Sequence, residues 1–458
     1  MPLPWVTFRL KAVGWSDLAL LFLLIFWITA YLKKYKNKFQ LGDMLLQLII
    51  VIVTFILVIS AIIFADSSYS TMSDKIISLM RVDTYVFFVI LILFEVWWLI
   101  ERYKKKGRIT PTDFDIPVMV FLLACMLSFI NSKAVEQSLF MFKGILAGAI
   151  IFYLLNDRFL NDRKALQKFV YFFLAGATLT AAIGLLQYTT GWPKGFIGVP
   201  GVHYAPAGDT FYARISSTMQ HPNILGQLLV LAFFTNLGII LEKKDWLLKK
   251  AYNYISSAII ILCLIFTYSR SAWLACILGL IALLILKFKE NKKVLITIVI
   301  ILLVAGALLY QPVLDRIKSS TGDDLSIVSR LEAWKSSWLM FKDYPLTGMG
   351  LNTFFINYSS YKTPGAPFLM ADAHNTFINL AVETGILGLA SFFWILVLCF
   401  KTCFKKSGFC LALGVAVFAL LIAGMFENLF FDTRVTTLMW VFFALISAYG
   451  TKKIHLKT

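Results

Sequence analysis

The residues from Asp324 to Gly388 read DLSIVSRLEAWKSSWLMFKDYPLTGMGLNTFFINYSSYKTPGAPFLMADAHNTFINLAVETGILG. This is the longest stretch of the chain that cannot lie in lipid, and it leads directly into an apolar helix. Nearly everything around it consists of apolar runs and short basic loops. We therefore expect the fold to be organised around this stretch, and any chemistry to take place in it and in the segments that face it.

The composition indicates a membrane protein. Hydrophobic residues make up 59% of the 458 residues and charged residues only 15%, whereas a soluble domain of this size needs far more polar surface. The apolar runs are continuous rather than alternating, and about 20 such residues cross a bilayer as a helix. The predicted fold class is an all-α polytopic membrane protein.

About thirteen apolar runs are predicted to span the membrane. Lys and Arg gather in short loops after every second run, which marks that side as cytoplasmic. The loops 66–83, 189–222 and 312–375 then face outside. The net charge of +18 is explained by these loops and does not indicate a nucleic-acid partner. The predicted spans are 17–32, 44–64, 84–100, 115–130, 138–155, 166–188, 223–241, 254–268, 272–286, 294–311, 376–399, 409–426 and 435–449.

The spans and loops divide the chain into five parts. These are an N-terminal bundle of six spans (1–188), an external Gly- and Pro-rich loop (189–222), spans seven to ten (223–311), a large external loop (312–375) and the C-terminal spans (376–458). The Gly/Pro-rich part predicts a turn-rich loop or a lid rather than a helix.

The large external loop is predicted to contain an amphipathic helix over 326–342, capped by Asp324 or Ser326. Two tryptophans on one face are typical of a helix lying flat at a membrane surface. The apolar residues that recur at helical spacing are Ile327, Leu331, Trp334, Trp338 and Phe341.

His374 lies at the outer end of an apolar span, next to Asn375, which is the expected cap of that helix. A helix N-terminus favours anions. Glu383 lies within the same span, where a carboxylate is costly and usually has a reason. These features make His374 a candidate catalytic residue, although a lone interfacial histidine is also a common structural hydrogen-bonding group.

Arg214, Arg270 and Arg330 fall on the same outer side as His374. Guanidinium groups bind phosphate oxygens through bidentate charge-assisted bonds, whereas the alternative for Arg270 is snorkelling to the interface. Several arginines and a histidine beside a membrane suggest a lipid-linked phosphate or pyrophosphate. The large loop has no acidic pair at metal spacing beyond Asp323-Asp324, which disfavours a metal-dependent mechanism.

At these residues the chain resembles the O-antigen ligase and Wzy-type polymerase superfamily, over about 210–390. The pieces that carry the resemblance are Arg214-Ile-Ser-Ser-Thr-Met-Gln-His-Pro-Asn223, Tyr268-Ser-Arg-Ser-Ala-Trp-Leu-Ala275, Ser329-Arg-Leu-Glu-Ala-Trp334 with Pro345-Leu-Thr-Gly-Met-Gly350, and His374-Asn375 followed by Glu383-x-Gly385-x-x-Gly388. Their order, spacing and common outer face make the combination specific.

The resemblance implies a GT-C-like, metal-independent glycosyltransferase that uses no cofactor. Such enzymes act at the outer face of the bacterial inner membrane, towards the periplasm or cell exterior. They move a glycan from undecaprenyl pyrophosphate to a hydroxyl of a glycan or lipid-linked acceptor. The essential arginines of the family correspond to Arg270 and Arg330 and its essential histidine to His374, either as general base or as a pyrophosphate-binding cation. Arg214, Asn375 and Glu383 are the expected substrate-binding residues.

The sequence leaves four alternatives for the function open. Within the superfamily, a ligase and a polymerase share the motifs, and a peptidoglycan-type glycosyltransferase fits them less well. A polysaccharide flippase or other transporter would show repeats and polar or broken helices at the bilayer midplane, whereas the unusual polar residues here gather at the outer surface. A purely structural membrane protein would not need so long an outer stretch. A neutral His374 is favoured by its place at a helix N-terminus.

Overall fold

The computed structural model describes residues 112–191, 203–207, 210–219, 221–242, 250–287, 325–366, 369–404 and 408–450. The chain divides into two compact units, Met1–Ile109 and Thr110–Thr458, and every described residue lies in the second. The predicted spans at 17–32, 44–64, 84–100 and 294–311 lie outside the described residues, as does the Asp324 cap. All the predicted site residues are described.

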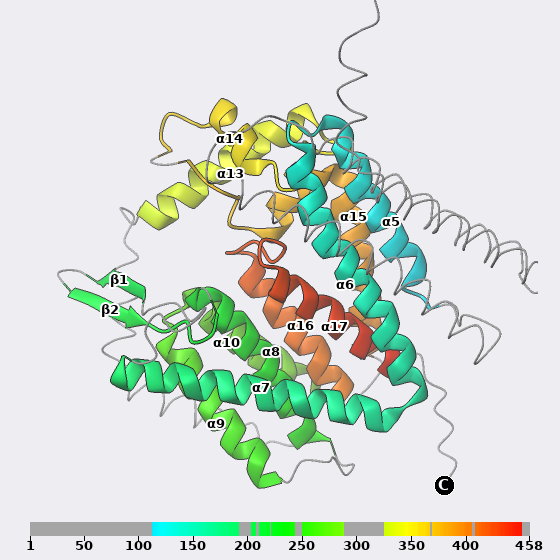
Figure 1. The fold of residues 1–458 in the computed structure, drawn as a ribbon, viewed down its shortest axis with the longest axis vertical. Coiled ribbons are helices and arrows are strands. Elements are labelled where there is room, and N and C mark those ends of the chain that lie inside the picture. Colours follow the sequence, from blue (N-terminus) through cyan, green and yellow to red (C-terminus); the bar gives the residue numbers. More distant parts are fainter. Residues whose placement is uncertain are drawn as a thin grey trace, which may run out of the picture. The chain divides into compact units, whose positions relative to one another are not determined.

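The other nine predicted spans are helices (Figure 1). Four of the described helices, α6, α7, α8 and α15, are long and apolar enough to cross a membrane by length and composition, and shorter apolar helices accompany them. The described part of the chain is therefore that of a helical membrane protein. The bounds are α5 Asp115–Leu127 followed by the 3₁₀ turn η2 Ser128–Asn131, α6 Val135–Asn161, α7 Arg163–Thr190, α8 Pro222–Leu241, α9 Lys250–Phe266, α10 Arg270–Lys287, α15 Thr376–Phe404, α16 Phe409–Gly424 and α17 Thr433–Gly450.

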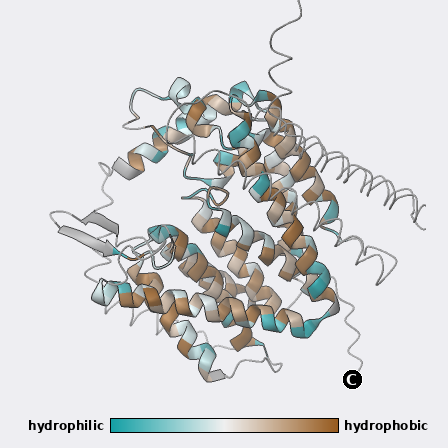
Figure 2. Cartoon of the chain, viewed as in Figure 1, coloured by the Kyte–Doolittle hydropathy of each residue, from teal (hydrophilic) through white to brown (hydrophobic). Residues whose placement is uncertain are grey.

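Helix α16 packs against α8, α10, α15 and α17, and nearly all of its residues are buried. Figure 2 shows that hydrophobic residues predominate along the helices around it. Helix α6 packs along α17, where Gly148 faces the ring of Trp440, and α5 packs on α15. The spans predicted at 115–130 and 138–155 as part of an N-terminal bundle therefore pack directly on C-terminal helices, whereas α7 packs mainly on α9 and α8.

The Gly- and Pro-rich segment 189–222, predicted to be external, contains a two-stranded antiparallel sheet, which the predicted all-α fold did not include. Strand β1 (His203–Ala207) pairs with β2 (Thr210–Arg214), and Ala207 is opposite Thr210. The sequence between the strands is Gly208-Asp209, a dipeptide typical of two-residue hairpin loops, and β2 is rich in aromatic residues that favour strands. The hairpin brings Arg214 back to the end of the loop.

The segment 312–375, predicted to be a large external loop, contains α13 (Leu325–Asp343) and α14 (Phe354–Tyr361). Helix α13 confirms the predicted helix over 326–342. Its buried face consists mostly of small residues, Ser329, Ala333, Ser336 and Ser337, together with Met340, whereas Leu331 and Trp338 remain 48% and 57% exposed. The apolar face predicted from the sequence is therefore partly exposed. Helix α13 packs instead through its small residues, which allow a close approach to its neighbours. A core cluster joins α13 to the loop and to α15: Ala333, Met340, Met349, Phe354, Tyr358, Met370, Ala373 and Val382.

Helix α15 has a kink at Gly385, where φ is 66° and ψ −167°. The segment from Pro345 to Gly350 pairs with this kink through backbone hydrogen bonds, among them Ile386 N to Pro345 O (2.8 Å) and Met349 N to Val382 O (2.9 Å). An added Cβ on Gly348 would lie 2.3 Å from the Glu383 carbonyl carbon, so only glycine permits this approach. The kink thereby fixes the end of α13 against the first half of α15.

Candidate active site

The site is built at the N-terminus of α15, which Asn375 caps as predicted. Its Oδ1 accepts hydrogen bonds from the backbone N–H groups of Phe377 (3.0 Å) and Ile378 (3.1 Å), satisfying donors that a helix start leaves unpaired. Its Nδ2 donates to the Met425 carbonyl at 3.0 Å. Both ends of this buried amide thus bind protein groups, and the substrate-binding role of Asn375 stays a prediction.

His374 precedes the cap and has a positive φ of 46°, an uncommon conformation for a residue other than glycine. Its backbone N–H donates to Asp372 Oδ1 at 2.6 Å. The imidazole Nδ1 lies 3.8 Å from Asp372 Oδ1 and 3.6 Å from Glu427 Oε2. Trp334 of α13 donates its indole N–H to the Ala373 carbonyl at 2.9 Å, which ties α13 to the residue before His374. The His374 side chain remains 31% exposed and can therefore meet a substrate.

The carboxylates around His374 change its protonation. Burial lowers the pKa of the His374 imidazole, but the Glu427 and Asp372 carboxylates outweigh burial and the repulsion from Arg330, so the pKa is raised. The pKa of Asp372 is also raised, mainly by burial. The expectation of a neutral imidazole considered only the helix N-terminus, whereas in the folded chain the two carboxylates stabilise the protonated form relative to a free histidine.

Arg330 of α13 reaches the same point. Its Nη2 lies 3.6 Å from Glu427 Oε1, and the two side chains are 21% and 19% exposed. Glu427 comes from the turn between α16 and α17. One carboxylate therefore lies against both Arg330 and His374, two candidate catalytic residues that are 44 positions apart in the sequence.

Arg214 is connected to this cluster through Asn223. Asn223, in the first turn of α8, donates its Nδ2 to Glu427 Oε1. Arg214 Nη2 donates to Asn223 Oδ1 at 2.8 Å, and Arg214 Nε donates to the Thr267 carbonyl at 3.1 Å. The structure thus joins the first motif of the resemblance to the third and fourth.

Arg270 and Glu383 are positioned by other parts of the fold. Arg270 is the first residue of α10, three positions after the Thr267 carbonyl that Arg214 binds, and is partly exposed. Glu383 is buried within α15, where its carboxylate faces the backbone N–H groups of Asn352 and Phe354 and the Asn379 side chain. It therefore braces the loop before α14, and its substrate-binding role stays a prediction.

Sequence reasoning missed Glu427, Asp372 and Asn223 as members of the site. The span alternation already predicted that the turn between 409–426 and 435–449 lies on the outer side, so the two acidic residues of that turn, Glu427 and Asp432, were a usable signal. Asn223 lay inside a quoted motif without a role. Among the described residues, no group of three His, Cys, Asp or Glu side chains gathers as a metal site would.

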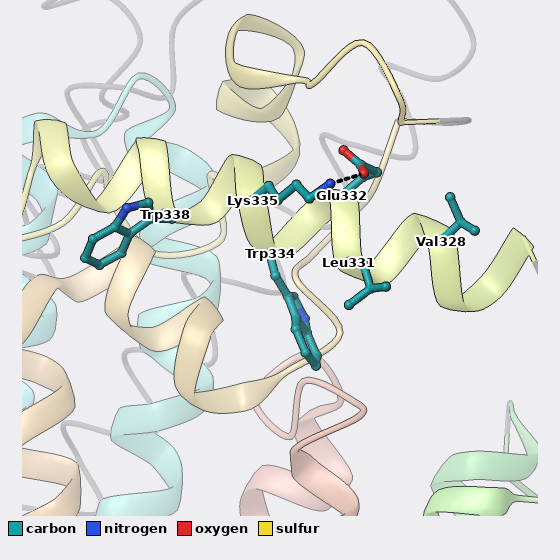
Figure 3. Close-up of a pocket in the computed structure, with 6 residues that line it drawn as sticks. All are labelled: Val328, Leu331, Glu332, Trp334, Lys335 and Trp338. Carbon is teal, nitrogen blue, oxygen red and sulfur yellow. Dashed lines mark hydrogen bonds and ion pairs between the residues drawn. The ribbon is translucent and has the colours of Figure 1, made fainter. Parts of the chain in front are cut away.

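An open hollow lies along the exposed part of α13 (Figure 3). Leu331 and Trp334 extend from the same side of the helix, and Lys335 forms an ion pair with Glu332 at 2.6 Å. The Glu332 carboxylate also accepts a hydrogen bond from Thr363 at 2.5 Å. The hollow is lined by Val328, Leu331, Glu332, Trp334, Lys335 and Trp338.

Comparison with known families gives one match. Residues 255–393 match a family model described as O-antigen ligase. The matched region contains Arg270, Arg330, His374 and Glu383, whereas Arg214 and Glu427 lie outside it. No curated protein matches the chain.

Proposed function

We propose, from the match of residues 255–393 to the O-antigen ligase family model, that this chain is a member of the O-antigen ligase and Wzy-type polymerase superfamily. It is a membrane glycosyltransferase that moves a glycan from undecaprenyl pyrophosphate to an acceptor hydroxyl, as a surface-polysaccharide ligase or polymerase. The transfer takes place at the outer face of the bacterial inner membrane. The fold is GT-C-like in this proposal.

The observation that carries the proposal is the convergence of Arg330 and His374 on Glu427 beside the N-terminus of α15. A guanidinium group and a protonated imidazole that are held together in this way can bind an anion through charge-assisted hydrogen bonds. A leaving pyrophosphate is such an anion, and fixed positive groups stabilise the charge that develops on it. Arg270, at the start of α10, is the second guanidinium that we assign to this task.

The chemistry balances without a metal ion or a cofactor. The acceptor oxygen attacks the anomeric carbon of the donor sugar and forms the new glycosidic bond. The bond from that carbon to the pyrophosphate oxygen breaks, and its electron pair leaves with undecaprenyl pyrophosphate. The proton of the acceptor hydroxyl passes to His374 Nε2. Positive charge from arginine takes the place that a divalent cation has in metal-dependent transferases.

His374 is arranged as an oriented general base. Its Nδ1 faces the carboxylates of Glu427 and Asp372, which hold the proton on that nitrogen and leave Nε2 for the acceptor hydroxyl. The same carboxylates stabilise the imidazolium once the proton has been taken, as in other carboxylate–histidine pairs. The raised pKa of His374 favours a second role, in which the protonated imidazole binds the pyrophosphate.

Purified protein incubated with undecaprenyl-pyrophosphate-linked glycan and an acceptor tests the proposal. We expect a longer or transferred glycan on a gel in the presence of EDTA. Arg330→Ala and Arg270→Ala should each lower transfer by about 10²–10³-fold, and Lys at these positions should restore only part because it lacks the planar fork.

Arg158→Ala is the matched control, since Arg158 forms only an exposed pair with Asp162 at 2.9 Å, at the far end of α6. Near-normal transfer in the Arg330 and Arg270 variants would show that these residues are interface anchors. Movement of lipid-linked glycan across sealed vesicles without any transfer would instead support a transporter. Supplying either lipid A–core sugar or a second lipid-linked repeat unit as acceptor separates a ligase from a polymerase.

A further inference from the structure

We propose that Glu427 is a positioning residue that holds Arg330 and His374 in one arrangement, and that Asn223 fixes Glu427 in turn. The inference rests on the proposed glycosyl transfer, for which it adds residues from outside the matched region of the chain. Glu427 touches no reacting atom in this proposal, and it acts through the two side chains that do.

The two oxygens of the Glu427 carboxylate have different partners. Oε1 accepts a hydrogen bond from Asn223 Nδ2 and lies 3.6 Å from Arg330 Nη2. Oε2 lies 3.6 Å from His374 Nδ1. A carboxylate can accept several hydrogen bonds at once, so a single side chain sets both the reach of the guanidinium and the orientation of the imidazole.

The backbone around Glu427 is itself attached to the start of α15. Thr376 Oγ1 donates to the Glu427 carbonyl at 2.8 Å and accepts from Leu429 N–H at 3.0 Å. Asn375 Nδ2 donates to the Met425 carbonyl two residues earlier. Since Asn375 and Thr376 directly follow His374, these bonds fix the distance between Glu427 and the histidine.

Glu427 is charged in this environment. Burial raises its pKa, but His374, Arg330 and His221 outweigh burial, so the pKa of Glu427 is lowered. The groups that face His374 are Glu427 from the α16–α17 turn, Asp372 from its own segment and Arg330 from α13. Removing the Glu427 charge leaves the repulsion from Arg330 less balanced, so the pKa of His374 should fall.

Asn223 extends the arrangement to a fourth segment. It links Glu427 to Arg214, which also binds the Thr267 carbonyl just before α10. The external hairpin, the N-terminus of α8 and the α9–α10 turn are thereby attached to the same carboxylate. This explains why a motif ending in Asn223 accompanies the arginine and histidine motifs.

Glu427→Gln tests the proposal, because it keeps the shape of the side chain and removes the charge. We expect transfer to fall between about 10²- and 10⁴-fold, as for other groups that orient a catalytic histidine. Asp432→Asn is the matched control, since Asp432 lies in the same turn and forms an ion pair with Arg434 at 2.5 Å away from His374. It should retain transfer.

A second measurement reports on His374 without requiring activity. Diethyl pyrocarbonate modifies neutral imidazole, and mass spectrometry of the His374 peptide against pH gives the midpoint of its titration. We expect the midpoint to move to lower pH in Glu427→Gln and to stay in place in Asp432→Asn. Glu427→Asp retracts the charge by one methylene, so it should give an intermediate midpoint, and it serves as the test variant if Glu427→Gln does not fold.

The outcomes separate the two proposals. A wild-type protein that transfers no glycan, with a midpoint that still shifts in the Glu427 variants, would overturn the proposed reaction and leave the positioning of His374 standing. A His374 midpoint that is the same in wild type, Glu427→Gln and Glu427→Asp would overturn the positioning role, whatever the activity. Equal losses of transfer in Glu427→Gln and Asp432→Asn would do the same, because they would reflect the turn rather than the contact.

Discussion

Gly385→Ala should separate the two halves of the site without touching either. Gly385 has φ 66° and ψ −167°, a region that is essentially restricted to glycine. A Cβ at this position would lie 2.2 Å from the Leu346 carbonyl oxygen and 2.3 Å from its carbon. Backbone atoms cannot move aside cheaply, so the segment from Pro345 onward must leave the kink.

The free energy cost follows from these contacts. The strained conformation costs about 1–3 kcal/mol in a residue other than glycine. The hydrogen bonds from Ile386 N–H to Pro345 O and from Leu387 N–H to Leu346 O are each worth about 0.5–1.5 kcal/mol. The sum of about 2–6 kcal/mol is a large part of a typical unfolding free energy of about 5–15 kcal/mol. Because the unfolding entropy grows with chain length, the midpoint of thermal unfolding of a chain of this size should then fall by roughly 2–8 °C.

Transfer should fall as well, because the displaced segment follows the helix that carries Arg330 and pairs with the helix that begins beside His374. The assay is thermal unfolding of the purified protein in detergent, together with glycan transfer below the transition. Gly176→Ala is the control, since an added Cβ there meets no atom within 4 Å, and alanine within a helix is more stable than glycine. A Gly385→Ala protein with the unfolding midpoint and transfer rate of wild type would refute the reasoning.

Three further predictions concern the site and its orientation. His374→Ala should keep donor affinity and lose transfer by about 10²–10⁴-fold. If His374 is the general base, wild-type turnover should be lost as pH falls through its pKa, which is raised. Loss of turnover as pH rises through that pKa would instead make His374 a pyrophosphate-binding cation. Trp334→Phe removes the hydrogen bond to Ala373 O and should cost about 0.5–1.5 kcal/mol of stability, measured as a lower unfolding midpoint; an unchanged midpoint would show that water replaces the indole. A cysteine in place of Ser359, which is exposed on α14, should react with a maleimide that does not cross the inner membrane. Background labelling should be low because all six native cysteines are buried. A cysteine in place of Lys164 should react only after permeabilisation, and the reverse pattern would contradict the topology.

The local sequence was sufficient for features that depend on neighbouring residues. Helix α13 was predicted from the spacing of its apolar residues, and α15 from a long apolar run with Asn375 as its cap, because caps and periodicity act within a few positions. The hairpin of β1 and β2 was missed because a Pro- and Gly-rich loop shows little periodicity, although the Gly208-Asp209 dipeptide of the sequence is typical of a tight turn.

The sequence by itself determined a helical membrane protein, the helix starts, and which residue types could carry the chemistry. Only the tertiary structure decided that Glu427 lies between Arg330 and His374. It also decided that Asn223 connects Arg214 to this group. On α13, the exposed side carries Leu331 and the buried side Ala333. Hydropathy and capping are properties of adjacent residues, whereas the protonation of His374 depends on carboxylates and a guanidinium that approach through space. The charge of the imidazole was therefore undetermined until its neighbours from α13 and the α16–α17 turn were in place.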